Sequence, residues 1–465
     1  MTATEVTGPG SQWRDSVHQP GSKVVAALLV AVLALAPLPF GSNIPLAWGV
    51  VAVAAGLLLG AYGVALWISG HGPRFAPGRL LPEGILFGLL CLWLAVQALP
   101  LGALVPIAFT GRQGQTVLAA HLSLAPGATW LMLLRMGTYL SVFIVTLQLS
   151  VNSRRGGLML RAIYFAIVFY AVLGLYMLTQ MNDTFFGIRK LAYLGSATAT
   201  FLNRNSYATF LAFGAVIGLA LVAGDCRAAW ARAEDDGAGL RRIRAGTWVV
   251  AIGWPLVLVA LVASQSRMGL VAGLAGCAAV MLLALRGVRF AARVWLVGLA
   301  LLTAVLAVAG LLFGTQLVDR LVFIAQGLGG RLDIYREVLA MIAARPLLGY
   351  GGGSFELAFP LFHAPPLPAL ESYDKAHSTY LGLWADLGIV GGTLPMVVVA
   401  GLCLRALRAL SRNADGSALS LAGLGVVAVG SLHSLVDFSL EIEANTLVYV
   451  AVLAMAVARM RQHPG

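Results

Sequence analysis

Long apolar runs recur along the whole chain, separated by short polar or basic segments. A helix of roughly 20 apolar residues is long enough to cross the hydrocarbon core of a bilayer, and it satisfies its backbone hydrogen bonds internally. The pattern predicts about twelve such helices, at residues 24–40, 44–69, 83–100, 128–150, 158–180, 206–224, 246–263, 267–285, 293–314, 377–404, 418–437 and 445–460.

The composition agrees with a membrane protein. Of the 465 residues, 59% are hydrophobic and only 11% are charged, and the mean hydropathy is +0.87. A soluble domain usually carries about 25% charged residues, so the sequence predicts an all-α polytopic membrane protein. The four cysteines lie in apolar runs or beside predicted cytoplasmic loops, and no CxxC spacing occurs, which favours neither a disulfide nor a zinc site.

The connections divide the chain into four parts. We expect a cytoplasmic tail at residues 1–22, transmembrane helices one to nine at 23–314, one large periplasmic loop at 315–376, and helices ten to twelve at 377–465. The first half of the large loop has the apolar spacing of an amphipathic helix that ends before Pro346, with Leu332, Tyr335, Leu339 and Ile342 on its apolar face. A loop of this length is usually functional or disordered, and the helical pattern favours a folded, site-forming loop.

The charge pattern sets the orientation. A net charge of +12 in a soluble protein would suggest nucleic acid, but a membrane protein needs cytoplasmic Lys and Arg, so no nucleic-acid partner is predicted. With the N-terminus in the cytoplasm, every short inside loop is basic. The positive-inside rule does not explain the remaining cations, which are Arg112, Arg135, Arg189, Lys190, Arg204, Arg267, Arg320, Arg331, Arg336, Arg345 and Lys375.

Two of these outside cations stand where helices are predicted to begin. Arg204 follows Asn203 and precedes Asn205, and Arg267 follows Ser266. Asn and Ser are good N-caps, but an Arg in the first turn has the wrong sign for the positive end of the helix dipole. Free N–H groups together with a guanidinium form an anion site suited to a diphosphate. The alternative is that each Arg reaches to lipid head groups at the interface.

A histidine stands at a third predicted helix start. His377 can serve as a general base because an unperturbed imidazole accepts protons near neutral pH, or it can be a capping residue. His433 and Asp437 are four residues apart in a predicted helix, so they could pair, either to bind sugar hydroxyls or as structural residues. Asp386 lies inside a predicted span and needs a partner or a wet cavity, and Arg135 is one candidate.

Two further patterns favour ordinary structure over chemistry. The run 349–354 is rich in glycine but lacks the Lys of a phosphate-binding loop, so we interpret it as a flexible turn. The outside segments contain no acidic cluster, which predicts a reaction without a metal ion or cofactor.

Several stretches resemble one known family. Residues 200–205, 264–269, 330–355 and 376–381, together with the ten-residue spacing between His377 and Gly388, are similar to bacterial O-antigen ligases and to O-antigen or exopolysaccharide polymerases. The segment 433–438 resembles the exopolysaccharide members, which favours a polymerase, while an O-antigen ligase stays open.

The resemblance implies a glycosyltransferase C-like, inverting enzyme of the bacterial inner membrane with a periplasmic active face. The donor would be an undecaprenyl-diphosphate-linked glycan, and the acceptor a hydroxyl of another glycan or of lipid A core, in lipopolysaccharide or exopolysaccharide biosynthesis. Arg204, Arg267 and Arg331 would bind the diphosphate and His377 would activate the acceptor, supported by Asn203, Asn205, Ser266, Arg336, His433 and Asp437. Membrane lipids and polysaccharide assembly proteins are the further partners.

A second class of function also fits a polytopic protein. A polysaccharide-lipid flippase or an anion transporter would need ionisable residues near the middle of several spans, and Asp386 is the clear candidate in this sequence. A membrane scaffold is a third alternative that no feature specifically supports.

Overall fold

The computed structural model describes residues 20–70, 72–185, 187–190, 192–231, 245–286, 307, 324–368, 371–412 and 417–460. The α-helices are α2 (Pro20–Leu35), α3 (Pro45–Ser69), α4 (Leu81–Ala98), α5 (Pro126–Ser150), α6 (Ser153–Thr179), α7 (Arg204–Ala231), α8 (Ala245–Ala263), α9 (Arg267–Ala284), α11 (Ile324–Ala344), α12 (Phe355–Ala358), α13 (Thr379–Arg412), α14 (Ser417–His433) and α15 (Glu443–Val457). Two antiparallel ribbons accompany them, β1 (Ile107–Thr110) with β2 (Thr116–Ala119) and β3 (Thr184–Phe185) with β4 (Ile188–Arg189).

The bundle of long apolar helices confirms an all-α polytopic membrane protein. Eight helices are long and apolar enough to cross a bilayer, and three shorter apolar helices correspond to α2, α14 and α15. Together they match all the predicted spans except 293–314, of which the structure describes residue 307 alone.

Proline and glycine mark the ends and bends of these helices. α3 and α5 begin at Pro45 and Pro126, where the missing N–H costs no hydrogen bond. α3 ends before Gly70, which has a φ of +65°. Inside α13 the backbone leaves helical geometry at Gly388, and Pro395 follows within the same helix, so the long helix bends near its outer third.

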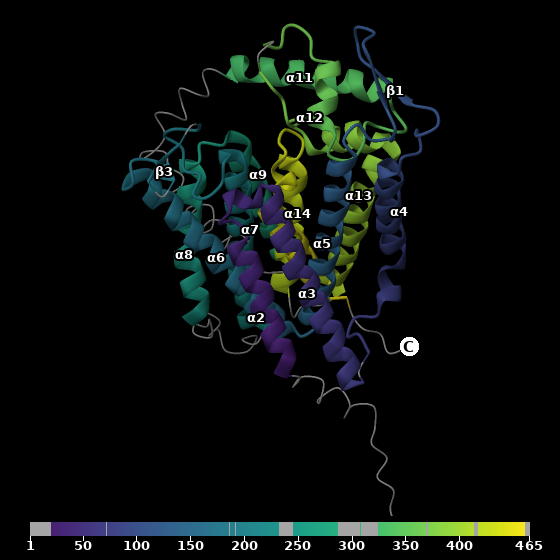
Figure 1. Ribbon diagram of the computed structural model, residues 1–465. Helices are drawn as coiled ribbons and strands as arrows, with labels where there is room; N and C mark the ends of the chain where they lie inside the picture. The colour runs from purple at the N-terminus through teal and green to yellow at the C-terminus, as the bar shows by residue number, and fades with distance from the viewer. Residues whose placement is uncertain are drawn as a thin grey trace, which may run out of the picture.

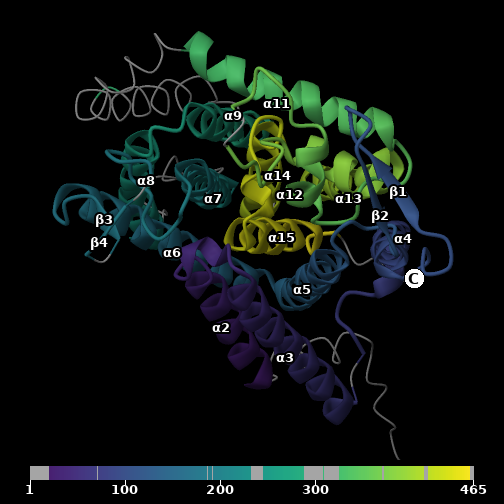
Figure 2. The same ribbon diagram turned by 45° about the horizontal axis from the view of Figure 1, so that its top comes forward.

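The helix α7 forms the centre of the bundle. Its membrane window is 83% buried inside the protein, whereas that of α3 is only 22% buried. α7 packs against α8, α9 and α14, and α14 packs in turn against α15 (Figure 2). The N-terminus of α7 therefore lies among other helix ends rather than facing lipid.

A cap covers one end of the bundle. α11, α12 and the β1–β2 hairpin lie together at the upper end in Figure 1. They share a hydrophobic core separate from that of the bundle, which includes Phe109, Val338, Tyr350 and Phe359. The predicted amphipathic helix is confirmed, since α11 ends at Ala344 just before Pro346. The hairpin was not predicted, because its strands are only four residues long.

The glycine-rich run is a close-packed turn between the cap and α13. Gly349, Gly351 and Gly353 all have positive φ values, which glycine adopts without strain. Gly351 N–H donates to the backbone oxygen of Asp386 at 2.8 Å, and a side chain at Gly351 would collide with Ser123. The prediction of a turn is confirmed, and Gly351 is buried rather than exposed.

Candidate functional site

The first part of the candidate site is the start of α7. Asn203 precedes the helix, and its Oδ1 accepts a hydrogen bond from the backbone N–H of Asn205 at 2.7 Å, as an N-cap does. Arg204, the first helical residue, places its guanidinium over the ring of Tyr193 at 5.3 Å from the centroid. Its Nε is buried without a hydrogen-bond partner. The aromatic face thus holds Arg204 while leaving donor groups available for an anion.

The start of α9 lies directly beside the start of α7. Ser266 caps α9, since its Oγ accepts from the Gly269 N–H at 3.3 Å. The same hydroxyl donates to Asn205 Oδ1 at 2.9 Å, which ties the two helix starts together. A Cβ built on Gly269 would lie 2.5 Å from the Cβ of Ala208, so glycine is what allows α9 to approach α7 this closely. Arg267 is the first residue of α9.

Asp437 joins the start of α13 to the other two. Its Oδ1 accepts from Asn205 Nδ2 at 3.0 Å, and its Oδ2 accepts from the Ser439 hydroxyl. Its backbone oxygen accepts from both the N–H and the hydroxyl of Thr379, each at 3.2 Å. Asp437 is 1% exposed, so these bonds form in a buried junction. The structure therefore brings the starts of α7, α9 and α13 together.

His377 lies two residues before α13 in a constrained backbone conformation. Its φ is +53°, which is unusual for a residue other than glycine, and the Tyr335 hydroxyl of α11 donates to its carbonyl at 2.9 Å. The imidazole contacts the Phe438 ring edge to face at 5.4 Å. Its Nδ1 is buried, and this ring nitrogen has no hydrogen-bond partner within the protein.

The surroundings of His377 lower the pKa of its imidazole. Burial is the largest cause, and the positive charge of Arg331 acts in the same direction, while Asp437 and Asp374 oppose it. Because the ordinary pKa is 6.5, a lowered value leaves the ring neutral at pH 7. A neutral imidazole can accept a proton, which is what a general base requires.

Nine of the eleven outside cations have described side chains, and these nine differ in their partners; the side chain of Arg189 and the whole of Arg320 lie outside the part of the chain that the structure describes. Five of them form ion pairs, Arg112 with Glu337, Arg135 with Glu443, Lys190 with Asp183, Arg336 with Asp333 and Lys375 with Glu441. Arg345 stacks on Phe109 and donates to Gly349 O at 2.8 Å. Among the described residues, Arg204, Arg267 and Arg331 have no carboxylate partner. These three are the arginines expected to bind diphosphate.

Two predicted supporting residues form their hydrogen bonds with groups other than those of the arginine cluster. Arg336 is exposed and bonds Asp333 one turn earlier on α11. His433 ends α14, and its Nδ1 shares a 2.6 Å hydrogen bond with the Thr209 hydroxyl. The expected helical pairing of His433 with Asp437 is wrong, because α14 stops at His433 and Asp437 follows a turn.

The expected pairing of Asp386 with Arg135 is also wrong. Arg135 Nε bonds Glu443 at 3.0 Å, and Tyr139 donates to the same carboxylate at 2.9 Å. Asp386 instead accepts from the Gly353 N–H at 2.8 Å through Oδ2. The sequence does not show whether Arg135 pairs with Asp386 or with Glu443. The packing of α5 on α15 places Glu443 beside Arg135.

Tyr193 and Tyr335 are site residues that the sequence did not reveal. Tyr335 was assigned to the apolar face of α11, and nothing in the pattern indicated that its hydroxyl would reach His377. Tyr193 lies in an irregular segment and has no sequence signal at all. In the described part of the chain, no group of three or more His, Cys, Asp or Glu side chains is placed to hold a metal ion.

The comparison with known proteins finds one family model that matches part of the chain. The model of a family described as O-Antigen ligase matches residues 251–396, about a third of the chain. This region contains Arg267, Arg331 and His377, and it leaves Arg204 and Asp437 outside. A search of the curated proteins finds no significant match. Over residues 251–396, the chain is thus similar to the O-antigen ligase family.

Proposed function

We propose that the protein is an extracytoplasmic glycosyltransferase that moves a glycan from undecaprenyl diphosphate to a hydroxyl of another glycan. The family supplies the coarser activity, which is that of an O-antigen ligase or polymerase. The donor, the inverting course of the reaction and its independence of metal ions are part of the proposal.

One observation carries the proposal. Arg204 and Arg267 each open a helix, the two helix starts are tied by the Ser266–Asn205 hydrogen bond of 2.9 Å, and neither arginine has a carboxylate partner among the described residues. Two cations without counter-ions repel each other, and the positive ends of the helix dipoles add to the repulsion. A diphosphate between them removes this cost and accepts several hydrogen bonds.

The reaction follows from the position of His377. Its free ring nitrogen accepts the proton of the acceptor hydroxyl while that oxygen forms a bond to the anomeric carbon of the donor sugar. The bond between this carbon and the diphosphate oxygen breaks, and the electron pair leaves with the diphosphate. Arg204, Arg267 and Arg331 stabilise the charge that develops there. A single displacement from the opposite side inverts the anomeric configuration.

The test is transfer by purified, full-length protein in lipid bilayers. Undecaprenyl-diphosphate-linked oligosaccharide is supplied with either lipid A core or a second lipid-linked glycan, and the acceptor that is consumed separates a ligase from a polymerase. We expect Arg204→Ala, Arg267→Ala and His377→Ala each to lower transfer by about 100-fold or more, as for the loss of charge stabilisation or of a general base.

The matched control is Arg154→Ala. Arg154 likewise lies in the first turn of a helix, α6, but it is exposed and that helix begins at the other end of the bundle. Arg154→Ala should transfer at the wild-type rate. Wild-type transfer by all three site variants would refute the proposal, and so would movement of the lipid-linked glycan across vesicles without any transfer, which a flippase predicts.

A further inference from the structure

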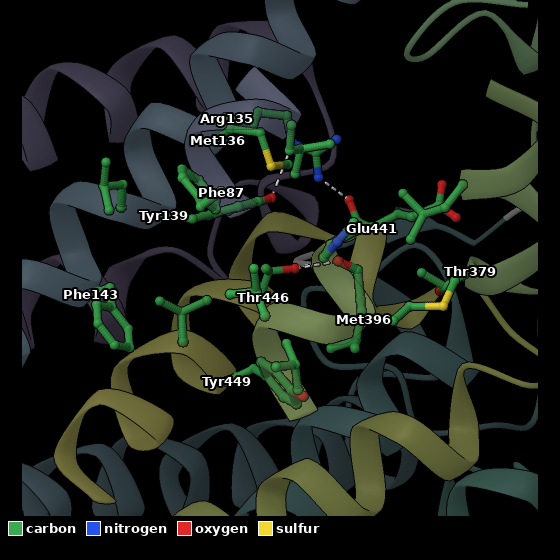
Figure 3. A pocket seen from close by; sticks show the side chains of 18 of the residues that line it. Phe87, Arg135, Met136, Tyr139, Phe143, Thr379, Met396, Glu441, Thr446 and Tyr449 are labelled. Carbon is green, nitrogen blue, oxygen red and sulfur yellow. Dashed lines mark hydrogen bonds between the residues drawn. The ribbon is translucent and has the colours of Figure 1, made fainter. Parts of the chain in front are cut away.

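A large cavity opens beside the arginine cluster. Its volume is about 1210 Å³, and its walls come from α3, α4 and α5 on one side and from α13, α14 and α15 on the other. Figure 3 shows Arg135 and Tyr139 on one wall and Thr446 and Tyr449 on the other. None of Arg204, Arg267, Arg331 and His377 lines it. It is therefore a second space, distinct from the proposed diphosphate site.

The deeper walls of this cavity are apolar. They belong to membrane-spanning helices and include Leu140, Phe143, Val398, Leu402, Tyr449 and Leu453. Such walls fit the hydrocarbon chain of an amphiphile, because ligand pockets are mostly apolar with a few oriented polar groups.

Both cations at the polar end of the cavity, Lys375 and Arg135, already pair with acidic side chains. Lys375 pairs with Glu441 at 3.3 Å. Arg135 bonds the Glu443 carboxylate and the backbone oxygen of Glu441. The other ionisable side chains at this end are acidic, namely Glu356, Asp374 and Asp386. This end repels a phosphate head group and suits a head group without negative charge.

Asp386 offers an acceptor atom to such a head group. Its side chain lines the cavity and is only 9% exposed. Oδ2 accepts from the Gly353 N–H, whereas Oδ1 is buried without a partner. A buried acceptor without a donor is costly, and carboxylate oxygens accept readily from hydroxyls.

We propose that this cavity binds an amphiphile whose head group is uncharged and rich in hydroxyls, with Asp386 Oδ1 accepting from one of them. Ala376 and Thr379, on either side of His377 in the chain, both line the cavity, which places the head group beside the proposed base. The binding site itself stands on the contacts above.

A substitution at Gly382 on α13 can fill part of the cavity with a side chain. A Cβ on Gly382 would lie 3.5 Å from Glu441 Oε1 and 3.7 Å from the Cβ of Ala376, which are ordinary contacts. Gly382→Leu therefore extends into the polar end without a backbone collision. Gly63→Leu is the matched control, because Gly63 is exposed on α3, away from the cavity, with nothing within 4 Å.

The experiment measures binding rather than transfer. Full-length protein in nanodiscs of phosphatidylethanolamine and phosphatidylglycerol is photolabelled with a diazirine-bearing dodecyl maltoside. We expect labelling of α5 and α13 peptides that dodecyl maltoside displaces at least about tenfold better than dodecyl phosphate. Gly382→Leu should lose this labelling and Gly63→Leu should keep it. Asp386→Asn, which retains an acceptor for Gly353, should weaken it several-fold.

Equal displacement by dodecyl phosphate would overturn the proposal, as would unchanged labelling of Gly382→Leu. Because the labelling experiment measures binding and not glycan transfer, its result can contradict the cavity proposal without contradicting the proposed function. Loss of transfer in the arginine variants without specific labelling would remove only the cavity proposal. Specific labelling without any transfer would remove only the proposed reaction.

Discussion

At the scale of single residues, the environment of His377 decides what its ring can do. Burial and the charge of Arg331 lower its pKa, while Asp374 and Asp437 raise it. The positive φ of +53° costs roughly 1–2 kcal/mol for a residue other than glycine. The Tyr335 hydrogen bond to the His377 carbonyl helps to hold this conformation, so the cap positions the ring as well as covering it.

A pH profile tests this environment. Only neutral His377 can accept a proton, so transfer should fall as the pH drops through the pKa of the ring, below its ordinary value of 6.5. Replacing Arg331 with Gln removes a positive charge that disfavours the imidazolium, and the pKa should rise. The acidic limb of kcat/KM against pH should therefore move to higher pH in Arg331→Gln.

The opposite charge change is the control. Asp374 favours the imidazolium, so Asp374→Asn should lower the pKa of His377 and move the acidic limb to lower pH. Opposite movements of the limb distinguish an effect on His377 from a general loss of activity. Acidic limbs that stay at the wild-type position in both variants would exclude His377 as the titrating base.

The residues that could be predicted are those with local signals. Arg204 and Arg267 were found because a capping Asn or Ser and an opposed dipole are visible within a few residues of sequence. Tyr193 was missed because its contact with Arg204 is purely tertiary. For the same reason the sequence offered Arg135 only as one candidate partner for Asp386, whereas the fold pairs it with Glu443.

At the scale of elements, the length of the apolar runs predicted which segments form spanning helices, but it predicted the first and last residues of these helices less well. The segment at 418–437 ends as a helix at His433, because Ser434 onward turns to reach α13 and α7. The β1–β2 hairpin was missed since two strands of four residues carry too little periodicity. In the sequence, only Gly269 itself indicates that α9 packs closely on α7.

That packing gives a test at a single glycine. Gly269→Ala places a Cβ against Ala208 and should separate the starts of α7 and α9. We expect it to destabilise the protein by about 1–3 kcal/mol and to weaken transfer. Gly56→Ala makes the same change on α3 with nothing within 4 Å and should keep the wild-type thermal midpoint. Equal midpoints and equal transfer for both variants would show that the close approach is unnecessary.

At the scale of the whole molecule, the cap lies at one end of the bundle (Figure 1). The candidate site contacts this cap through Tyr335, and the polar end of the cavity includes Lys375 and Ala376, next to His377. The proposed chemistry needs this end outside the cytoplasm, where lipid-linked glycans replace nucleotide sugars as donors. The basic inside loops favour that orientation. Membrane topology is thus a requirement of the mechanism.

Labelling of cysteines tests this topology directly. Gln113 is exposed between β1 and β2, and Arg154 is exposed at the start of α6, one membrane crossing later. In a background whose four native cysteines are replaced by serine, Gln113→Cys should react with a membrane-impermeant maleimide in intact spheroplasts. Arg154→Cys should react only after lysis, because the charged reagent cannot cross the bilayer. Labelling in the reverse order would place the arginines and His377 in the cytoplasm, where the proposed reaction has no donor.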